Sequence, residues 1–149
     1  MNTLWDGGST LSFITFNKAK ELKLQGRKVK LGIIKVGAQT TELDSCLYNV
    51  SLVESSGRVH AIEAFGIERI SSSIESVNME EIAKIFNIER RSIARPQSGE
   101  VDLLLGIQYA SLHPVRTKSS GNLLLMENQF DRVIAGSHPL VQNCPHITQ

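Results

Sequence analysis

The chain has few of the residues that commonly build disulfide frameworks or metal sites. Its two cysteines, Cys46 and Cys144, lie far apart and form no spacing motif, so we expect both to be free thiols. The four histidines are scattered, and none stands at the short spacing that zinc ligands favour. No Gly-x-Ser-x-Gly motif occurs, so the sequence lacks the nucleophile turn of many serine hydrolases. We therefore expect no metal and no cofactor.

Long apolar runs and an excess of one charge are also missing. No segment approaches the roughly 20 apolar residues of a membrane-spanning helix, and the first residues lack the charged and apolar regions of a signal peptide. The 16 basic and 15 acidic residues leave a net charge of +1, far from the basic footprint of a nucleic-acid-binding protein. These absences predict an intracellular, cytoplasmic protein that binds neither nucleic acid nor membrane.

The composition is that of a globular domain. With 149 residues, of which 41% are hydrophobic, the chain can bury one core without disulfides. We expect one domain over residues 1–139 and an unstructured tail over residues 140–149.

Most of the domain is predicted to be β. Alternating segments flank Glu54-Ser55-Ser56-Gly57, which is typical hairpin turn chemistry. A second hairpin is expected to turn at Gly37 and Ala38. The predicted strands are residues 29–31, 33–36, 46–53, 58–65, 101–105, 123–126 and 133–135. Two short helices are also predicted, one running from Phe16 to a cap at Gly26 and one capped by Asn78, with Glu81 three residues further on.

The most informative segment is Leu4-Trp5-Asp6-Gly7-Gly8-Ser9-Thr10. Two apolar residues bring one carboxylate into a glycine turn, which hydroxyl residues then close. Aspartic proteases present their catalytic aspartate in this way. Asp6 is therefore the candidate catalytic residue, and the candidate active-site loop consists of Gly7, Gly8, Ser9 and Thr10. Near the other end of the chain, the apolar segment 101–105 runs into Gly106, as in the second half of a retropepsin, and this glycine is expected to form a structural loop beside the first.

The ordered series of motifs resembles the aspartic endopeptidases of Pao/BEL-type retrotransposons, a retropepsin-like group. The matching residues are Trp5-Asp6-x-Gly8-Ser9-Thr10-x-Ser12-Phe13-Ile14-Thr15, the helix after them, the Val36-Gly37 hairpin, Ala64-Phe65-Gly66-Ile67 and Val101-Asp102-Leu103-Leu104-Leu105-Gly106. The likeness covers about residues 4–139. It implies a retropepsin-like closed β-barrel or sheet with two short helices, one lobe per chain.

The same resemblance implies an endopeptidase that cuts a retrotransposon polyprotein, in the cytoplasm or inside a virus-like particle. The hairpin tip formed by Lys35, Val36, Gly37 and Ala38 would be a flap over the peptide substrate. Only five residues precede Asp6, and a retropepsin has strands before this loop, so further strands are expected upstream in a longer polyprotein.

Aspartic protease chemistry requires two carboxylates within hydrogen-bonding distance. The sequence holds one Asp-Gly-Gly-Ser, so we expect a homodimer with one Asp6 from each subunit. Two carboxyl groups that close share one proton and titrate as a pair. Activity is therefore expected at acidic to mildly acidic pH.

Two positions depart from the family pattern. Gly7 stands where serine or threonine is usual, and that hydroxyl normally braces the two active-site loops across the dimer. Phe130 is followed by Asp131, where glycine is expected. The missing hydroxyl supports an alternative hypothesis, a catalytically silent retropepsin-like module for dimerisation or peptide binding. Asp102 is a second acid at the mouth of an apolar strand, and we assign it a structural role.

Overall fold

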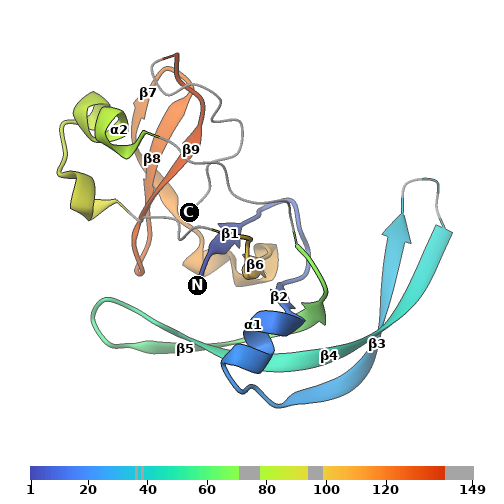
Figure 1. Ribbon diagram of the computed structural model, residues 1–149. Helices are drawn as coiled ribbons and strands as arrows, with labels where there is room; N and C mark the ends of the chain where they lie inside the picture. Colours follow the sequence, from blue (N-terminus) through green and yellow to red (C-terminus); the bar gives the residue numbers. More distant parts are fainter. Residues whose placement is uncertain (36, 38, 71–77, 94–98, 140–149) are drawn as a thin grey trace.

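The computed structural model describes residues 1–35, 37, 39–70, 78–93 and 99–139, which are mostly β (Figure 1). Their strands form two sheets, ordered β1-β6-β2-β5-β4-β3 and β7-β8-β9. The strands are β1 (Thr3–Trp5), β2 (Phe13–Thr15), β3 (Gly26–Lys35), β4 (Gln39–Val53), β5 (Val59–Ile67), β6 (Leu103–Leu105), β7 (Val115–Ser120), β8 (Leu123–Glu127) and β9 (Arg132–Gly136). The expected tail lies outside the described residues.

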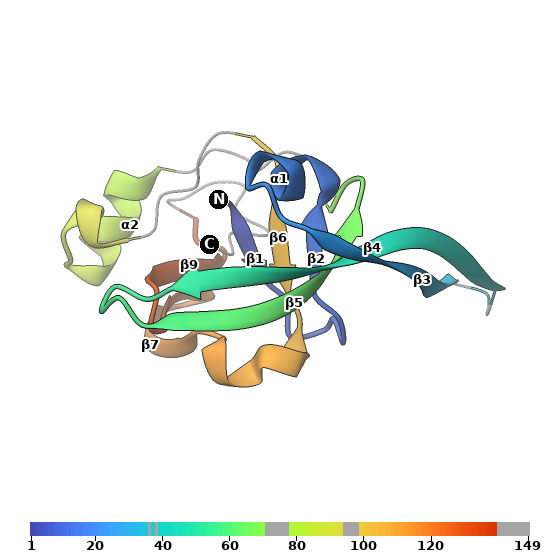
Figure 2. The same ribbon diagram turned by 90° about the horizontal axis from the view of Figure 1, so that it is seen from below.

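The mostly β prediction is confirmed, but the expected closed barrel is wrong. Within the described residues neither sheet closes on itself. Closure would require the outer strands β1 and β3 to pair. Instead the β3–β4 hairpin extends away from the rest of the molecule (Figures 1 and 2), and the last three strands form a sheet of their own.

Three short strands make the centre of the candidate site. β6 pairs in parallel with β1 and antiparallel with β2, so it lies between two strands that are neighbours in the sequence (Figure 2). The register aligns Trp5 with Leu105 and Phe13 with Leu104. The segment joining β1 to β2 therefore has to pass over the end of β6.

The long hairpins follow the sequence pattern. β4 and β5 pair antiparallel from Leu47↔Phe65 to Val53↔Val59, which confirms the predicted hairpin. β3 is one continuous strand rather than two, and it pairs with β4 from Gly26↔Tyr48 to Lys35↔Gln39.

The predicted helices form, with one change at a boundary. α1 (Phe16–Glu21) begins at Thr15, whose side chain accepts a hydrogen bond from the Lys18 amide. It does not reach Gly26, which instead begins β3. The helix ends because Lys23 takes the left-handed conformation (φ 55°) and the Leu24 amide donates back to the Ala19 carbonyl at 2.9 Å, a Schellman ending.

α2 (Met79–Phe86) confirms the predicted cap, because the Asn78 side chain accepts from the Glu81 amide at 3.3 Å. Two 3₁₀ helices that the sequence pattern did not predict, η1 (Arg90–Ser92) and η2 (Ile107–Leu112), complete the described elements.

The described residues build two hydrophobic cores rather than the single core expected. The first lies between the six-stranded sheet, α1 and η2; its buried members are Ile14, Ala19, Val50, Ile62, Ala64, Leu103, Leu105 and Leu112. The second lies between α2 and the three-stranded sheet; its buried members are Met79, Ile82, Ala83, Phe86, Ile93, Leu123, Leu125 and Ile134. We call these parts the first and second lobes.

Candidate active site

Asp6 lies directly after β1, at the point where β6 ends beside it. The Asp6 amide donates to the Leu105 carbonyl at 3.0 Å, so the pairing of the two parallel strands continues onto the candidate catalytic residue. Asp6 is half-buried, and Gly7 and Gly8 are exposed. The β sheet thus brings one carboxyl group to an open glycine turn.

The loop is closed by its own polar groups. The Gly8 amide donates to Asp6 Oδ1 at 2.9 Å, and the Ser9 amide donates to the Asp6 carbonyl at 3.2 Å. Ser9 Oγ donates to the Leu11 carbonyl at 2.7 Å. These bonds fix the orientation of the Asp6 carboxyl group and leave Thr10 exposed at the tip.

The Gly106 turn contacts the Asp6 loop, as we expected from the sequence. The Ile107 amide donates to the Ser9 carbonyl at 2.7 Å, and the Gly106 amide donates to the buried Ser12 Oγ at 2.9 Å. A Cβ on Gly106 would stand 2.7 Å from the Ser9 carbonyl oxygen and closer still to that of Leu11. Only glycine allows this approach of backbone to backbone.

Gly7 has room for a side chain. A Cβ built on Gly7 meets nothing within 4 Å, and the φ of Gly7 is not positive. Gly8 differs, because its Cβ would come within 3.2 Å of Asp6 Oδ1. The backbone at position 7 can therefore accept a serine or a threonine.

Three rings surround the start of the loop and join the two lobes. Trp5 stacks on Phe130 with ring centroids 6.0 Å apart and meets the His113 ring edge-on at 5.6 Å. Phe130 belongs to the turn between β8 and β9, and Ser55 at the tip of the β4–β5 hairpin donates to the Phe130 carbonyl at 3.2 Å. The residue before Asp6 is therefore a contact point between the lobes.

An acid–histidine pair lies beside this aromatic group. Glu54 Oε1 is 2.6 Å from His60 Nε2, and the His60 ring meets Phe130 edge-on at 5.6 Å. The hydrogen bonds from His60 and then Ser56 lower the pKa of the Glu54 carboxyl group. This pair stabilises the hairpin tip that contacts the second lobe.

Asp102 takes the structural position we expected and lies before β6, at the end opposite to Asp6. Its Oδ2 accepts from the Asn2 amide at 2.8 Å and lies 3.9 Å from the Lys18 amine. The pKa of Lys18 is raised mainly by its hydrogen bond to Glu21, and the negative charge of Asp102 raises it further. Asp102 thus holds the starts of β1, β6 and α1 together.

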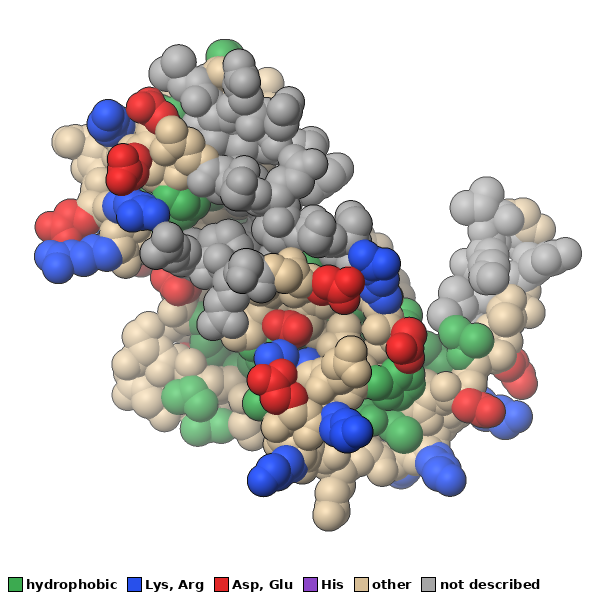
Figure 3. Space-filling view, viewed as in Figure 1, with side chains coloured by type: hydrophobic (Ala, Val, Ile, Leu, Met, Phe, Trp, Pro, Cys, Tyr) green, Lys and Arg blue, Asp and Glu red, His purple; other side chains and the backbone are tan. Residues whose placement is uncertain are grey.

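The expected flap tip is described only in part. Lys35 ends β3, and Gly37 turns the chain with φ 102°; Val36 and Ala38 lie outside the described residues. Acidic and basic side chains lie close together on α1 and on the neighbouring β3–β4 hairpin (Figure 3). Lys18 and Glu21 form one such pair at 2.7 Å, and Lys30 and Asp44 another at 4.0 Å.

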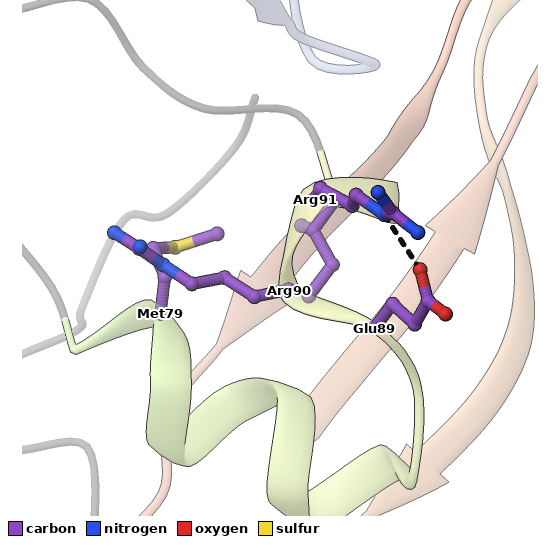
Figure 4. Close-up of a pocket in the computed structure, with 5 residues that line it drawn as sticks. Met79, Glu89, Arg90 and Arg91 are labelled. Atoms are coloured by element: carbon purple, nitrogen blue, oxygen red, sulfur yellow. Dashed lines mark hydrogen bonds and ion pairs between the residues drawn. The ribbon is translucent and has the colours of Figure 1, made fainter.

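A cavity of about 690 Å³ lies in the second lobe (Figure 4), and none of its described lining residues belongs to the Asp6 loop. It is lined by Met79, Glu89, Arg90, Arg91 and Ile93. The one carboxylate among its described lining residues, Glu89, forms an ion pair with Arg91 at 2.7 Å. Among the described lining residues no acid is without an ion-pair partner, and we place the candidate site at the Asp6 loop instead.

The described residues contain neither a metal-binding group nor a membrane-spanning helix. No three His, Cys, Asp or Glu side chains of the described residues come together in a group that could hold a metal ion. In the same part of the chain, none of the helices has the length and apolar character needed to cross a membrane.

Comparison of the chain with models of known protein families, with curated proteins and with solved structures found no match.

Proposed function

We propose that the chain is a retropepsin-like aspartic endopeptidase that acts as a homodimer, with one Asp6 from each copy. The observation that carries the proposal is the support of the Asp6 loop by the Gly106 turn. Leu105 accepts from the Asp6 amide at 3.0 Å, and Ile107 donates to the Ser9 carbonyl at 2.7 Å. An acid fixed in this way on an open loop is suited to meet its symmetry mate across a two-fold axis.

The paired carboxyl groups would divide the chemistry between them. One carboxylate takes a proton from water, whose oxygen attacks the carbonyl carbon of the peptide bond. The other carboxyl donates its proton to the carbonyl oxygen. Collapse of the tetrahedral intermediate then breaks the C–N bond: the carboxyl group that took the proton from water passes it to the leaving nitrogen, and a hydroxyl of the intermediate returns a proton to the other carboxylate. Because the pair must begin with one shared proton, the reaction favours acidic pH.

The projecting β3–β4 hairpin supports the assignment of an extended peptide as substrate. The hairpin projects away from the rest of the free chain, so it would have to fold over the Asp6 loop to bind a peptide backbone through hydrogen bonds and exclude water from it. By the resemblance of its motifs, the natural substrate is the polyprotein of a retrotransposon, processed in the cytoplasm.

Gly7 favours the alternative, a dimerisation or peptide-binding module without catalysis, because it removes the hydroxyl that braces the two loops. A peptide cleavage assay distinguishes the protease from the silent module. The purified protein is incubated near pH 5 with a library of unstructured peptides, with and without a general aspartic-protease inhibitor, beside the Asp6→Asn variant.

The proposal expects cleavage that the inhibitor blocks and that Asp6→Asn abolishes, while the variant keeps the circular dichroism spectrum of the parent. Cleavage that survives Asp6→Asn would exclude Asp6 as the catalytic residue. Dimerisation without cleavage, in both the parent and Gly7→Ser, would support the silent module.

A further inference from the structure

We infer that His113 is a positioning residue that fixes the Gly106 turn and, through it, the Asp6 loop. The inference extends the proposed function, and it rests on the hydrogen bond between His113 Nε2 and the Gly106 carbonyl, 2.8 Å long. His113 stands seven residues after Gly106, at the far end of η2, and returns to the turn from which that helix starts.

The peptide groups around Gly106 form hydrogen bonds with the other segments of the site. The carbonyl before it accepts from the Asp6 amide, its own amide donates to Ser12 Oγ, and the amide after it donates to the Ser9 carbonyl. The remaining group, the Gly106 carbonyl, accepts from the Tyr109 amide at 3.2 Å and from His113 at 2.8 Å. The His113 bond is the shorter of these two, and it comes from a side chain.

His113 also contacts β1, the strand that leads into the loop. Its ring meets Trp5, the residue before Asp6, with centroids 5.6 Å apart and planes at 73°. One half-buried side chain thus contacts both the strand that delivers Asp6 and the turn that supports the loop. Movement of the Gly106 turn relative to β1 would have to break one of these contacts.

His113 does not act on the reacting atoms in this inference. A carbonyl accepts from the ring whether the imidazole is neutral with its proton on Nε2 or fully protonated. The hydrogen bond is therefore kept across the acidic range in which the proposed protease works. Positioning depends on the Nε2 donor and less on the aromatic ring.

Two substitutions separate the donor from the ring. Gln carries an amide nitrogen near the place of Nε2, so His113→Gln keeps the donor and loses the ring. His113→Phe keeps a ring against Trp5 and loses the donor. We would measure amide hydrogen exchange of residues 6–12 and 105–107 in the parent and both variants, with the α2 amides as an internal control, and kcat and KM for a cleaved peptide.

The expected result is that His113→Phe speeds exchange in these two loops by about tenfold while the α2 amides keep their rates, and that His113→Gln stays close to the parent. In the cleavage assay, His113→Phe should lower kcat by about tenfold with little change in KM, and His113→Gln should restore kcat. Equal exchange in the parent and His113→Phe, or equal damage in both variants, would overturn the inference.

The exchange measurement does not need a working enzyme. If the parent cleaves no peptide, the proposed function fails, yet loss of protection in His113→Phe with rescue in His113→Gln would still establish how the loop is held. If the parent cleaves and the two variants exchange as the parent does, the positioning role fails and the protease stands.

Discussion

At the scale of single residues, Gly7 and Gly106 show opposite reasons for glycine. Gly106 is enclosed by the carbonyls of Ser9 and Leu11, whereas nothing lies within 4 Å of a Cβ on Gly7. We expect Gly106→Ala to lower the free energy of unfolding by about 1–3 kcal/mol, because backbone atoms have to move. Gly7→Ala, the matched control, should change it little. Urea unfolding of both variants provides the measurement, and equal losses would contradict the assigned packing.

Gly7 also offers a gain of function at the same scale. Under the proposed function, Gly7→Ser should place a hydroxyl between the two loops, and a hydrogen bond across the dimer would be worth about 0.5–1.5 kcal/mol at each of two symmetric positions. We expect a smaller dimer dissociation constant in sedimentation experiments, together with faster peptide cleavage. Position 7 is open and its φ is not positive, so a serine there causes no backbone strain. A weaker dimer would therefore contradict the proposed contact across the dimer.

At the scale of elements, the tip of the β4–β5 hairpin should respond to acid. The hydrogen bonds from His60 and Ser56 hold the pKa of Glu54 below its usual value of 4.5. A carboxyl group whose pKa is lower in the folded state contributes stability above its unfolded pKa, and that stability is lost as the pH falls through the folded pKa. The parent should therefore lose more Tm than Glu54→Gln as the pH drops from 4.5 towards 3. Parallel curves for the two proteins would show that the pair is energetically silent.

Local patterns were the part of the fold that the sequence could predict. The Asn78 cap and the β4–β5 hairpin depend on neighbours a few residues apart, and both were found. β7 was missed because its side chains, from Val115 to Lys118, are all exposed and show no apolar alternation. The split into two sheets was also missed, since a strand pattern does not state which edges pair.

Only those parts of the candidate site that consist of consecutive residues could be predicted from the sequence. The Asp6 loop and the Gly106 turn each stand out in the sequence. About a hundred residues separate the two, so no local pattern shows that they touch. We expected their contact from the resemblance. The bond from His113 to the Gly106 carbonyl left no signal, since a lone histidine before Pro114 indicates only an extended backbone.

At the scale of the whole molecule, the two lobes meet at Trp5 and Phe130. Trp5 is the one tryptophan of the chain, so its fluorescence reports on this contact. We expect the parent to unfold in a single transition seen equally by fluorescence and by far-ultraviolet circular dichroism. Phe130→Ala removes the stacked ring and should separate the two curves, with fluorescence changing at lower denaturant. Coincident curves in the variant would mean that other contacts couple the lobes.

The position of β6 between β1 and β2 has a consequence for the order of synthesis and folding. Among the described residues, residues 3–5 pair with β6, a strand that leaves the ribosome about a hundred residues later. The β4–β5 hairpin closes locally and can form early, whereas the ends of β1 and β6 meet only after a long loop closes, which is the slow kind of contact. A nascent chain therefore carries Asp6 without its support until residue 107 has emerged, and the site is assembled as one of the last events of folding.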